Sequence, residues 1–386
     1  MQHDEGIASR SFGGESGGVE HFISVEASDG LAFADQLHLV EQRYAAAREA
    51  LNLAPESAIF RRVFVSDAMN QAAPVRDSSL CGTRAEGAVA VSIVQQPPLP
   101  GAKIALLAYH ITGDAGVAKR RLSPNHVLVE KNGLRHLWST RLCAGSDAAP
   151  ATAAGQTREI FADLIDTLAN AGGTLRDHCV RTWIYLKDVD VFYQDMVESR
   201  SELFQRQGLT ADTHYIASTG IEGACAHRYD LVTMDAYSIL GLAPEQISYL
   251  NDFDRLCPTR NYGVTFERGT RIGYADRSHH FVSGTASIDR TGAVVHRGDV
   301  LRQLNRALDN VDALLRSGQA GLDDMMHLTV YLRDPADFAS VDGYLSERFR
   351  GLPMLILHGA VCRPEWLIEV EGVAAAADNA PTLPAF

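Results

Sequence analysis

A chain of 386 residues, 46% of them hydrophobic and 22% charged, can form roughly two to four domains and bury its own core. Such a chain needs neither disulfides nor a structural metal in order to fold. Its 35 Lys and Arg residues against 48 Asp and Glu residues give a net charge of −13, and the lack of any basic run argues against nucleic acid as the main ligand.

The cysteines and the apolar stretches indicate the compartment. Six cysteines are scattered along the chain, with no CxxC pair and no zinc spacing of Cys and His, which is typical of free thiols in a reducing environment. No apolar stretch reaches the length of a membrane span, and the polar, Gly/Ser-rich start lacks the apolar region of a signal peptide. We therefore expect a cytoplasmic protein with no membrane partner.

Three segments of the chain begin alike and continue in the same order. Their openings are His21–Ser24, His136–Ser139 and His280–Ser283. Each opening is followed by an amphipathic helix and then by an apolar strand that ends at an aspartate, which is Asp67, Asp188 or Asp334. The separations from serine to aspartate are 67 − 24 = 43, 188 − 139 = 49 and 334 − 283 = 51 residues. Near-constant spacing between matched positions predicts one supersecondary unit that is used three times.

Periodicity fills in the rest of each unit. Apolar residues recur at helical spacing over 160–168 and 301–315, and these helices end near Gly173 and Gly318. Second helices are predicted at 192–207 and 338–349. The closing strands are predicted at 102–109, 231–239 and 366–374. The predicted fold class is therefore α+β, with helices on one face of each sheet.

The three units are predicted to span residues 18–115, 124–242 and 259–376. The stretches 113–125 and 241–258 are richer in Gly, Pro and polar residues and are the predicted linkers.

The segment Gly298–Val341, with the sequence HFVSGTASID before it, resembles the RidA/YjgF family. The resemblance covers most of the second and third units and, more loosely, the first. Members of that family usually form homotrimers with pockets between subunits. The resemblance therefore implies three tandem chorismate mutase-like βαβ units that form a pseudo-trimer within one chain.

The last strand of the third unit carries a carboxylate that the other units lack. Glu369 lies between two apolar residues, and strand alternation places it on the same face as Glu371. Burial in a pocket would raise the pKa of Glu369 and make it a usable general acid. The matching positions hold Ala105 and Thr233, which cannot titrate. The alternative interpretation is an edge-strand carboxylate facing water, although a glutamate at the matching place lines the RidA pocket.

Ordinary RidA enzymes hydrolyse imines and enamines and bind the substrate carboxylate with an arginine on the penultimate strand. The matching strand here, Pro353–His358, contains no arginine, and neither do the stretches 88–94 and 216–220. The sequence is instead similar to chorismatases, a RidA-like branch that removes pyruvate from chorismate with a catalytic glutamate on the final strand. The similar stretches are Arg181–Trp183, Tyr193 with Asp195 and Arg200, Thr219–Ile221, Tyr262–Gly263, Phe266–Arg268 and Leu367–Gly372.

This second resemblance implies roles for three residues. In the branch that forms 3-hydroxybenzoate, a glycine follows the serine of the first strand and a cysteine precedes the glutamate by seven residues. Gly284 and Cys362 match these positions, since 369 − 362 = 7; the hydrolytic branch tends to carry alanine there. The resemblance thus implies that Glu369 donates a proton to the enolpyruvyl group, that Gly284 leaves space beside the ring, and that Cys362 steers the product towards 3-hydroxybenzoate.

Chorismate is a dicarboxylate, and arginines bind carboxylates through paired, charge-assisted hydrogen bonds. The candidate substrate-binding residues are Arg181, Arg200, Arg268, Gly284, Tyr193, Tyr215 and Tyr262. Each also has an ordinary structural interpretation, which is ion pairing for the arginines and packing for the tyrosines and for Cys362. The neighbours His279 and His280 would point to opposite faces of a strand, so a shared metal is not expected. We expect neither a metal nor a cofactor.

Three functions remain open from the sequence. The first is a chorismatase-like lyase or hydrolase that acts on a small anionic metabolite. The second is a RidA-type imine or enamine hydrolase, and the third is a non-catalytic small-molecule binding protein of the same fold. Arginines that converge on Glu369 would favour the first. Ribonuclease activity, which has been attached to the family, ranks lower because the chain is acidic.

Overall fold

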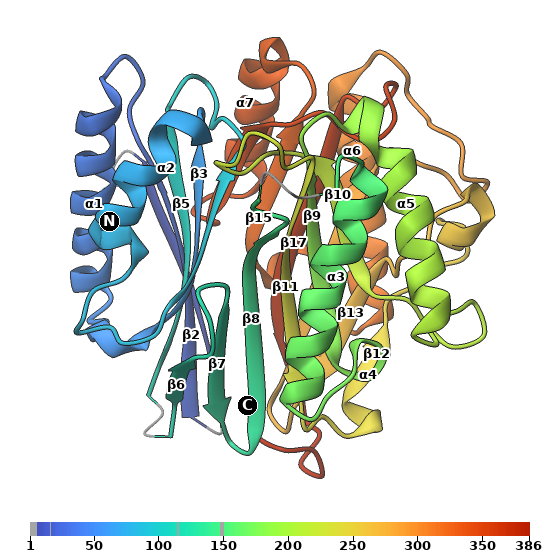
Figure 1. Cartoon of the computed structure of the whole chain (residues 1–386), viewed down its shortest axis with the longest axis horizontal. Helices are drawn as coiled ribbons and strands as arrows, with labels where there is room; N and C mark the ends of the chain where they lie inside the picture. The colour runs from blue at the N-terminus through green and yellow to red at the C-terminus, as the bar shows by residue number, and fades with distance from the viewer. Residues whose placement is uncertain (1–5, 16, 114–115, 147–149) are drawn as a thin grey trace.

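The computed structural model describes residues 6–15, 17–113, 116–146 and 150–386, and successive parts of the chain each form one sheet with its own helices (Figure 1). Unit one contains β1 (Ile7–Gly14), β2 (Gly17–Glu26), α1 (Phe33–Ala50), β3 (Ala58–Val65), α2 (Ala68–Asp77), β4 (Ala90–Gln95) and β5 (Ile104–Thr112). Unit two contains β6 (Ala118–Arg121), β7 (His126–Lys131), β8 (Leu134–Cys143), α3 (Ala153–Asn170), α4 (Leu175–His178), β9 (Cys179–Leu186), α5 (Val189–Arg206), β10 (Ala217–Glu222) and β11 (Val232–Leu240). Unit three contains β12 (Ile247–Tyr249), β13 (Gly269–Gly273), β14 (Arg277–Ala286), α6 (Val300–Ser317), β15 (Met325–Leu332), α7 (Phe338–Arg348), β16 (Met354–His358) and β17 (Ile368–Ala377).

The three sheets share one strand order, which confirms the predicted α+β repeat. In each, the closing strand lies between the opening strand and the strand after the first helix, and a fourth strand pairs in parallel at the edge. The shared orders are β2-β5-β3-β4, β8-β11-β9-β10 and β14-β17-β15-β16.

The aspartates that end the matched strands have a common local role. Asp67 and Asp188 cap the helices α2 and α5, since each side chain accepts a hydrogen bond from a backbone N–H of the first turn. Asp334 does the same for the short helical turn at Pro335–Asp337. The repeated aspartate is therefore a helix-capping signal, and it explains why each strand stops where it does.

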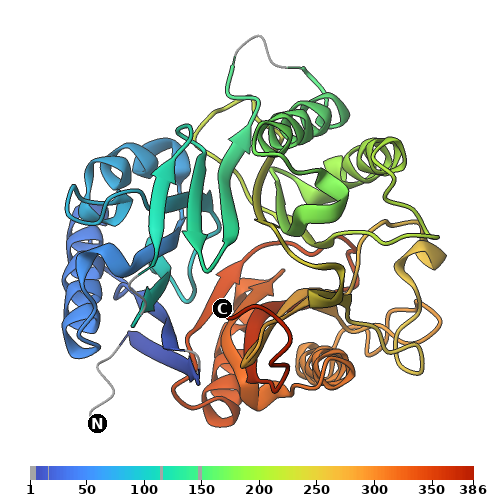
Figure 2. The same ribbon diagram turned by 90° about the horizontal axis from the view of Figure 1, so that it is seen from below.

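The units close into a ring with their helices outside and their sheets facing the centre (Figure 2). A buried ion pair joins each unit to the next. Its three instances are Arg62–Asp235 at 3.0 Å, Arg181–Glu371 at 2.6 Å and Arg277–Glu20 at 3.1 Å. Because each pair crosses a different boundary between units, the covalent pseudo-trimer is held together by polar contacts as well as by packing.

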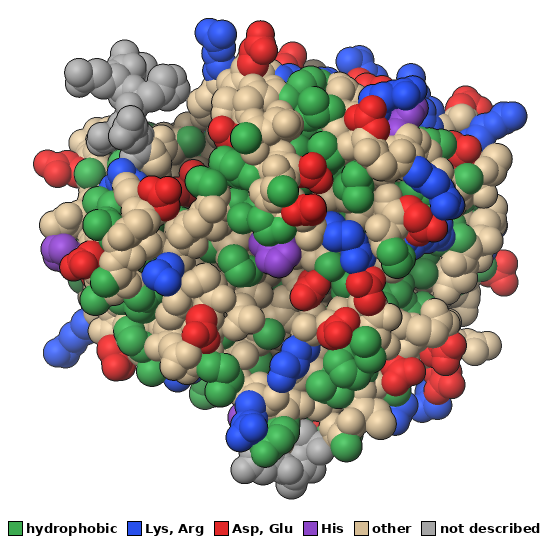
Figure 3. Space-filling view, turned by 90° about the horizontal axis from the view of Figure 1, so that it is seen from above, with side chains coloured by type: hydrophobic (Ala, Val, Ile, Leu, Met, Phe, Trp, Pro, Cys, Tyr) green, Lys and Arg blue, Asp and Glu red, His purple; other side chains and the backbone are tan. Residues whose placement is uncertain are grey.

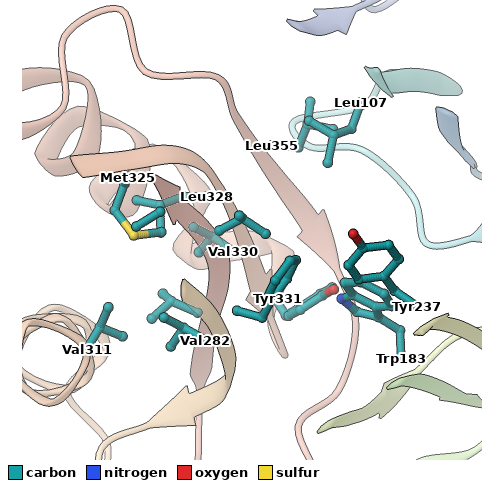
Figure 4. Close-up of a cluster of buried hydrophobic side chains, with 14 of the residues drawn as sticks. Leu107, Trp183, Tyr237, Val282, Val311, Met325, Leu328, Val330, Tyr331 and Leu355 are labelled. Carbon is teal, nitrogen blue, oxygen red and sulfur yellow. The ribbon is translucent and has the colours of Figure 1, made fainter. Parts of the chain in front are cut away.

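One hydrophobic cluster spans all three units. It includes Leu107 of unit one, Trp183 of unit two and Tyr331 of unit three (Figure 4). Helix α6 packs on its sheet through the predicted apolar stripe, in which Leu304, Leu308 and other residues at helical spacing are buried. The shared core fixes the units relative to one another and so positions any site that lies between them.

Three short edge strands lie where sequence patterns predicted none. Strand β1 precedes residue 18 and pairs with β2, and β6 and β12 lie inside the stretches predicted as linkers. These strands are short or largely exposed, so they carry little of the apolar alternation that identifies a strand.

On the side seen from above, acidic and basic side chains are intermingled, and neither sign of charge gathers into a patch (Figure 3). Among the described residues, no helix combines the length and the apolar character needed to cross a membrane.

Candidate active site

A cavity of about 290 Å³ lies where units two and three meet. Helix α5 and strand β10 of unit two supply one wall, and β14 and β17 of unit three supply another. The segments 262–268 and 362–366 complete the lining. Bridges between Ala217 and Glu267 and between Ile221 and Val361 join β10 to the first of these segments and to the residue that precedes the second. The cavity therefore exists only because two units are in contact.

Glu369 is the one carboxylate in the cavity lining. It lies on β17 opposite Ala286 of β14 and Tyr331 of β15, and it is 5% exposed. Within the described part of the chain its carboxyl group has no hydrogen-bond or ion-pair partner. Burial, reinforced by the nearby charge of Glu371, raises the pKa of Glu369 to about 8. A carboxyl group in this state is protonated at neutral pH and can act as a general acid.

Glu371 lies on the same face of β17, as predicted, but it is fully engaged. It accepts hydrogen bonds from Arg181 at 2.6 Å, from the Tyr331 hydroxyl at 2.8 Å and from the Thr219 hydroxyl. These three donors satisfy both oxygens of its buried carboxyl group. Two glutamates separated by a single residue therefore have different environments. The carboxylate of Glu371 is hydrogen-bonded by three donors, whereas the carboxyl group of Glu369 faces the cavity.

Arg181 was predicted to bind substrate, but the structure assigns its side chain elsewhere. It does not line the cavity, and its guanidinium group donates to Glu371, to Thr219 and to the Thr182 carbonyl oxygen. The group also packs 4.8 Å from the Trp183 ring centroid. Since Arg181 is buried behind the cavity wall, we correct its role to positioning Glu371.

Arg200 and Arg268 do line the cavity, and both are almost completely buried. Arg200 donates to Ser218 Oγ at 3.4 Å, while its Nε and Nη2 atoms have no partner among the described residues. Arg268 donates to the Cys257 carbonyl oxygen at 3.2 Å, and its Nε atom likewise has no partner there. Buried guanidinium donors without acceptors are costly, so a lining of this kind is suited to an anionic ligand.

A third guanidinium group, from Arg363, was missed by sequence reasoning. Arg363 lines the cavity, donates to the Gly292 carbonyl oxygen at 3.1 Å, and packs on the Tyr262 and Trp366 rings. Only its position beside Cys362 could have drawn attention to it, because no periodic pattern includes this loop. Ser218 of β10 and Trp366 also line the cavity and were not singled out, while Thr219 was noted only as part of a motif.

Two of the three predicted tyrosines line the cavity. Tyr193 of α5 and Tyr262 are part of its wall, but Tyr215 faces a separate hollow beside Glu267. Tyr215 is therefore withdrawn as a candidate for direct contact with a ligand in this cavity. Cys362 lines it, and burial together with the charge of Glu369 raises the pKa of the Cys362 thiol to about 12. The thiol is thus neutral, so it can shape the cavity but is a weak nucleophile.

Gly284 lines the cavity, and its lack of a side chain leaves room for the Glu369 carboxyl group. A Cβ atom at this position would collide with Oε1 of Glu369 and would lie 3.0 Å from Cγ2 of Thr219. The space at Gly284 is therefore taken by the Glu369 carboxyl group. The backbone N–H of Gly284 donates to Thr219 Oγ1 at 2.8 Å, which keeps the strand close to β10.

The register of the sheets confirms that only unit three carries this carboxylate. Glu369 pairs with Tyr331, the seventh residue of β15, and the seventh residues of β9 and β3 pair with Thr233 and Ala105. These matched positions are the ones predicted from the sequence. The cavity between units two and three is therefore chemically distinct from the matching places in the ring.

The two histidines considered as metal ligands make separate contacts. His279 bonds to Glu20 at 2.8 Å, whereas His280 bonds to Ser278 at 3.0 Å. The cavity lining itself offers Glu369 and Cys362 as its groups of a metal-binding type.

Comparisons with known proteins agree with this architecture. Residues 274–376 match the family described as Endoribonuclease L-PSP. A chorismatase of Streptomyces rapamycinicus is 31% identical over 248 residues, which are 58% of this chain and 70% of that protein. A RutC family protein of Pyrococcus abyssi is 37% identical over 97 residues, which are 24% of this chain and 76% of that protein. A chorismatase crystal structure at 1.08 Å resolution aligns with a TM-score of 0.61 and 20% identity, covering 83% of this chain and 93% of that one.

Proposed function

The chain belongs to the chorismatase family, and on this premise we propose that it cleaves the enolpyruvyl ether of chorismate to pyruvate and a hydroxybenzoate. One observation carries the proposal, which is the buried carboxyl group of Glu369 in a cavity that also receives the guanidinium groups of Arg200 and Arg268. An acid and two cations in one enclosed space suit a dianionic enol ether, which needs charge neutralisation and a proton.

Glu369 supplies the proton in this mechanism. Its raised pKa keeps the carboxyl group protonated near neutral pH, and it has no other polar partner among the described residues to hold the proton. Transfer of the proton to the methylene carbon of the enolpyruvyl group leaves an oxocarbenium-like centre, with the positive charge shared by the adjacent carbon and the ether oxygen. The bond between that oxygen and the ring carbon then breaks more easily, and pyruvate leaves with the oxygen and the bonding electron pair. The neighbouring ring hydroxyl oxygen moves to the vacated ring carbon, and loss of one ring proton to solvent leaves aromatic 3-hydroxybenzoate.

The arginines orient the substrate. Arg200, Arg268 and Arg363 present guanidinium groups around the cavity, and the aromatic rings of Tyr262 and Trp366 pack against Arg363. Paired hydrogen bonds to the two substrate carboxylates would fix the enolpyruvyl group beside Glu369. Held in this way, the methylene carbon can face the acid.

Gly284 and Cys362 support 3-hydroxybenzoate as the aromatic product. Both residues line the cavity, and both match the glycine and cysteine of the branch that forms 3-hydroxybenzoate. Pyruvate and hydroxybenzoate together contain all the atoms of chorismate, so this outcome consumes no water. Hydrolysis would instead add one water molecule and release a non-aromatic diol. The neutral thiol of Cys362 beside Glu369 gives the cavity a less polar wall than a second carboxylate would.

The proposal is tested by incubating the purified chain with chorismate. Pyruvate is followed by its coupled reduction with lactate dehydrogenase, and aromatic products are separated by chromatography against 3- and 4-hydroxybenzoate standards. We expect pyruvate and 3-hydroxybenzoate in equal amounts. Glu369→Gln should reduce the rate by about 10²–10⁴-fold, the usual contribution of a general acid.

Glu26→Gln is the matched control. Burial raises the pKa of Glu26 to about 7, yet Glu26 lines a different cavity between units three and one. Wild-type rates in the Glu369→Gln variant would overturn the mechanism. Absence of pyruvate with the wild-type chain would overturn the activity. In that case, ammonia release from an imine would favour the RidA-type hydrolase, which the lack of arginine on β4, β10 and β16 argues against.

A further inference from the structure

A second cluster of reactive side chains lies in unit two, outside the cavity described above. Cys143 ends strand β8, and Cys225 and Asp230 lie on the segment between β10 and β11. One ligand atom from each of these three residues lies within 4.8 Å of the other two. Cys225 Sγ is 3.2 Å from Asp230 Oδ2. None of the three takes part in the proposed reaction.

The charge of Asp230 is compensated poorly. Its side chain is fully buried, and it accepts hydrogen bonds from the Gly145 N–H at 3.0 Å and from the Cys225 thiol. Among the described residues no Lys or Arg forms an ion pair with it, and the nearest cationic candidate is His227, with Nδ1 3.4 Å from Asp230 Oδ1. Buried carboxylates are normally paired with a cation or bound to a metal, so this arrangement indicates a missing positive charge.

The two thiols lie beside the buried carboxylate of Asp230. Both thiols are half-buried, and one ligand atom of each lies within 4.8 Å of a carboxylate oxygen of the buried Asp230. Two sulfur atoms and a carboxylate oxygen are ligands that zinc accepts in a tetrahedral site with one further position.

We propose that Cys143, Cys225 and Asp230 are the three protein ligands of a Zn²⁺ ion. On binding, each thiol loses its proton to solvent and two Zn–S bonds form, so the site releases two protons per ion and binds more tightly as pH rises. The ion would tie the end of β8 to the segment that follows β10. Because β10 also carries Ser218 and Thr219 of the catalytic cavity, the metal would stiffen one wall of that cavity from a distance.

Sequence spacing could not reveal this site. Cys143 and Cys225 are 225 − 143 = 82 residues apart, and only the folding of unit two brings β8 beside the β10–β11 segment. The motif Cys-x-His-x-x-Asp at 225–230 is too short and too common to have been singled out. The expectation of no metal came from the missing CxxC pair, which detects only ligands that are close in sequence.

The test uses the full chain after reduction and removal of metals by a chelator. Zn²⁺ is titrated in competition with a chromophoric chelator, and Co²⁺ is added separately to look for absorption by cobalt–thiolate bonds. We expect one ion per chain, release of two protons, and a higher unfolding midpoint with Zn²⁺ present. Cys143→Ser and Cys225→Ser should each abolish all three effects, and Asp230→Asn should weaken binding at least tenfold.

Cys81→Ser is the matched control, because Cys81 is also a half-buried free thiol but lies in unit one, away from the cluster. It should bind Zn²⁺ like the wild type. Equal unfolding midpoints for the metal-free variants and the metal-free wild type would show that loss of binding is not loss of folding. Absence of Zn²⁺ uptake by the reduced wild type would overturn the proposal, and so would unchanged uptake by Cys225→Ser or a Cys143–Cys225 disulfide with no uptake after its reduction.

Discussion

The carboxyl group of Glu369 fills the space that a side chain at Gly284 would need. A Cβ atom added to Gly284 would collide with Oε1 of Glu369, and the Thr219 methyl group bounds the same space at 3.0 Å. Strand β14 therefore sets the position of an acid that is carried by β17. The smallest residue in the cavity determines where the proposed proton donor can point.

Gly284→Ala should displace the Glu369 carboxyl group and impair proton transfer. Overpacking of this kind costs about 1–3 kcal/mol of stability. If the displacement of the acid raises the barrier to proton transfer by about 1.4 kcal/mol, turnover falls about tenfold. The aromatic share of the product should fall as well, because a displaced acid leaves room for water. The measurements are the rate of pyruvate formation and the ratio of 3-hydroxybenzoate to diol. Gly343→Ala on the exposed face of α7, where a Cβ meets no atom within 4 Å, is the control and should leave both unchanged.

The pH dependence of kcat/KM should report the protonation of Glu369. Burial and Glu371 raise its pKa to about 8, and the active form is the protonated one. The value of kcat/KM is therefore expected to be flat below about pH 7 and to fall about tenfold per pH unit above pH 8. Glu369→Gln should retain a residual rate without this alkaline limb. A wild-type profile that rises through pH 8 would contradict the role of Glu369 as an acid and would indicate a base.

The same carboxyl group should make stability depend on pH in a defined direction. The folded pKa of about 8 lies above the ordinary value of 4.5, so the folded chain binds the extra proton. Because the carboxyl group ionises less readily in its buried site than in the unfolded chain, it lowers the free energy of unfolding as pH rises. This loss of stability is absent below about pH 4.5, grows as pH rises towards 8 and then remains constant. Glu369→Gln should therefore have a free energy of unfolding higher than that of the wild type by roughly a few kcal/mol at pH 9. Its unfolding temperature should accordingly be higher than that of the wild type at pH 9 and similar at pH 5. The exposed Glu245, replaced by Gln, should show no such difference between the two pH values.

Much of the fold could be predicted because its signals are local and are repeated three times. The aspartates at 67, 188 and 334 cap the next helical turn, and the stripe on α6 contacts the sheet, so each mark has a direct physical cause. The strands β1, β6 and β12 were not predicted, because exposed edge strands need little apolar alternation. Their pairing is decided by neighbouring strands that lie elsewhere in the chain.

The site was predictable only where one residue type carried the signal. Glu369 stood out as a carboxylate in an apolar strand, and two of the predicted tyrosines, two of the predicted arginines, Gly284 and Cys362 line the same cavity. Arg181 does not line the cavity, because its side chain pairs with Glu371. Glu371 comes from another unit, 371 − 181 = 190 residues away, and no local pattern reveals that contact. Arg363 was missed because irregular loops have no periodicity. Contacts between units determine which arginines line the cavity and which are buried behind its wall.

Arg200→Gln should weaken substrate binding and yet stabilise the free protein. The Nε and Nη2 atoms of Arg200 lack partners among the described residues, so the buried cation is costly until an anion binds. Loss of hydrogen bonds to a charged group should raise KM by about ten- to a hundredfold, which corresponds to roughly 1.5–3 kcal/mol. The unfolding midpoint without ligand should rise. Arg206→Gln, at an exposed position on the same helix, is the control and should change neither quantity. An unchanged KM for Arg200→Gln would show that its guanidinium does not bind the substrate.

Glu371→Gln should affect both stability and the pH profile, because Glu371 is a partner of Arg181 and a charge beside Glu369. Breaking a buried ion pair while leaving one partner charged typically costs about 3–5 kcal/mol, so the unfolding midpoint should fall clearly. The variant also loses the negative charge that raises the pKa of Glu369 and leaves the charge of Arg181, which lowers it, uncompensated. The alkaline limb of kcat/KM should consequently move to lower pH. Asp235→Asn breaks the matching pair with Arg62 at another boundary of the ring and should destabilise the fold to a similar extent without moving that limb. If both variants shifted the limb equally, the effect would come from general loosening of the ring, and the electrostatic coupling between Glu371 and Glu369 would be refuted.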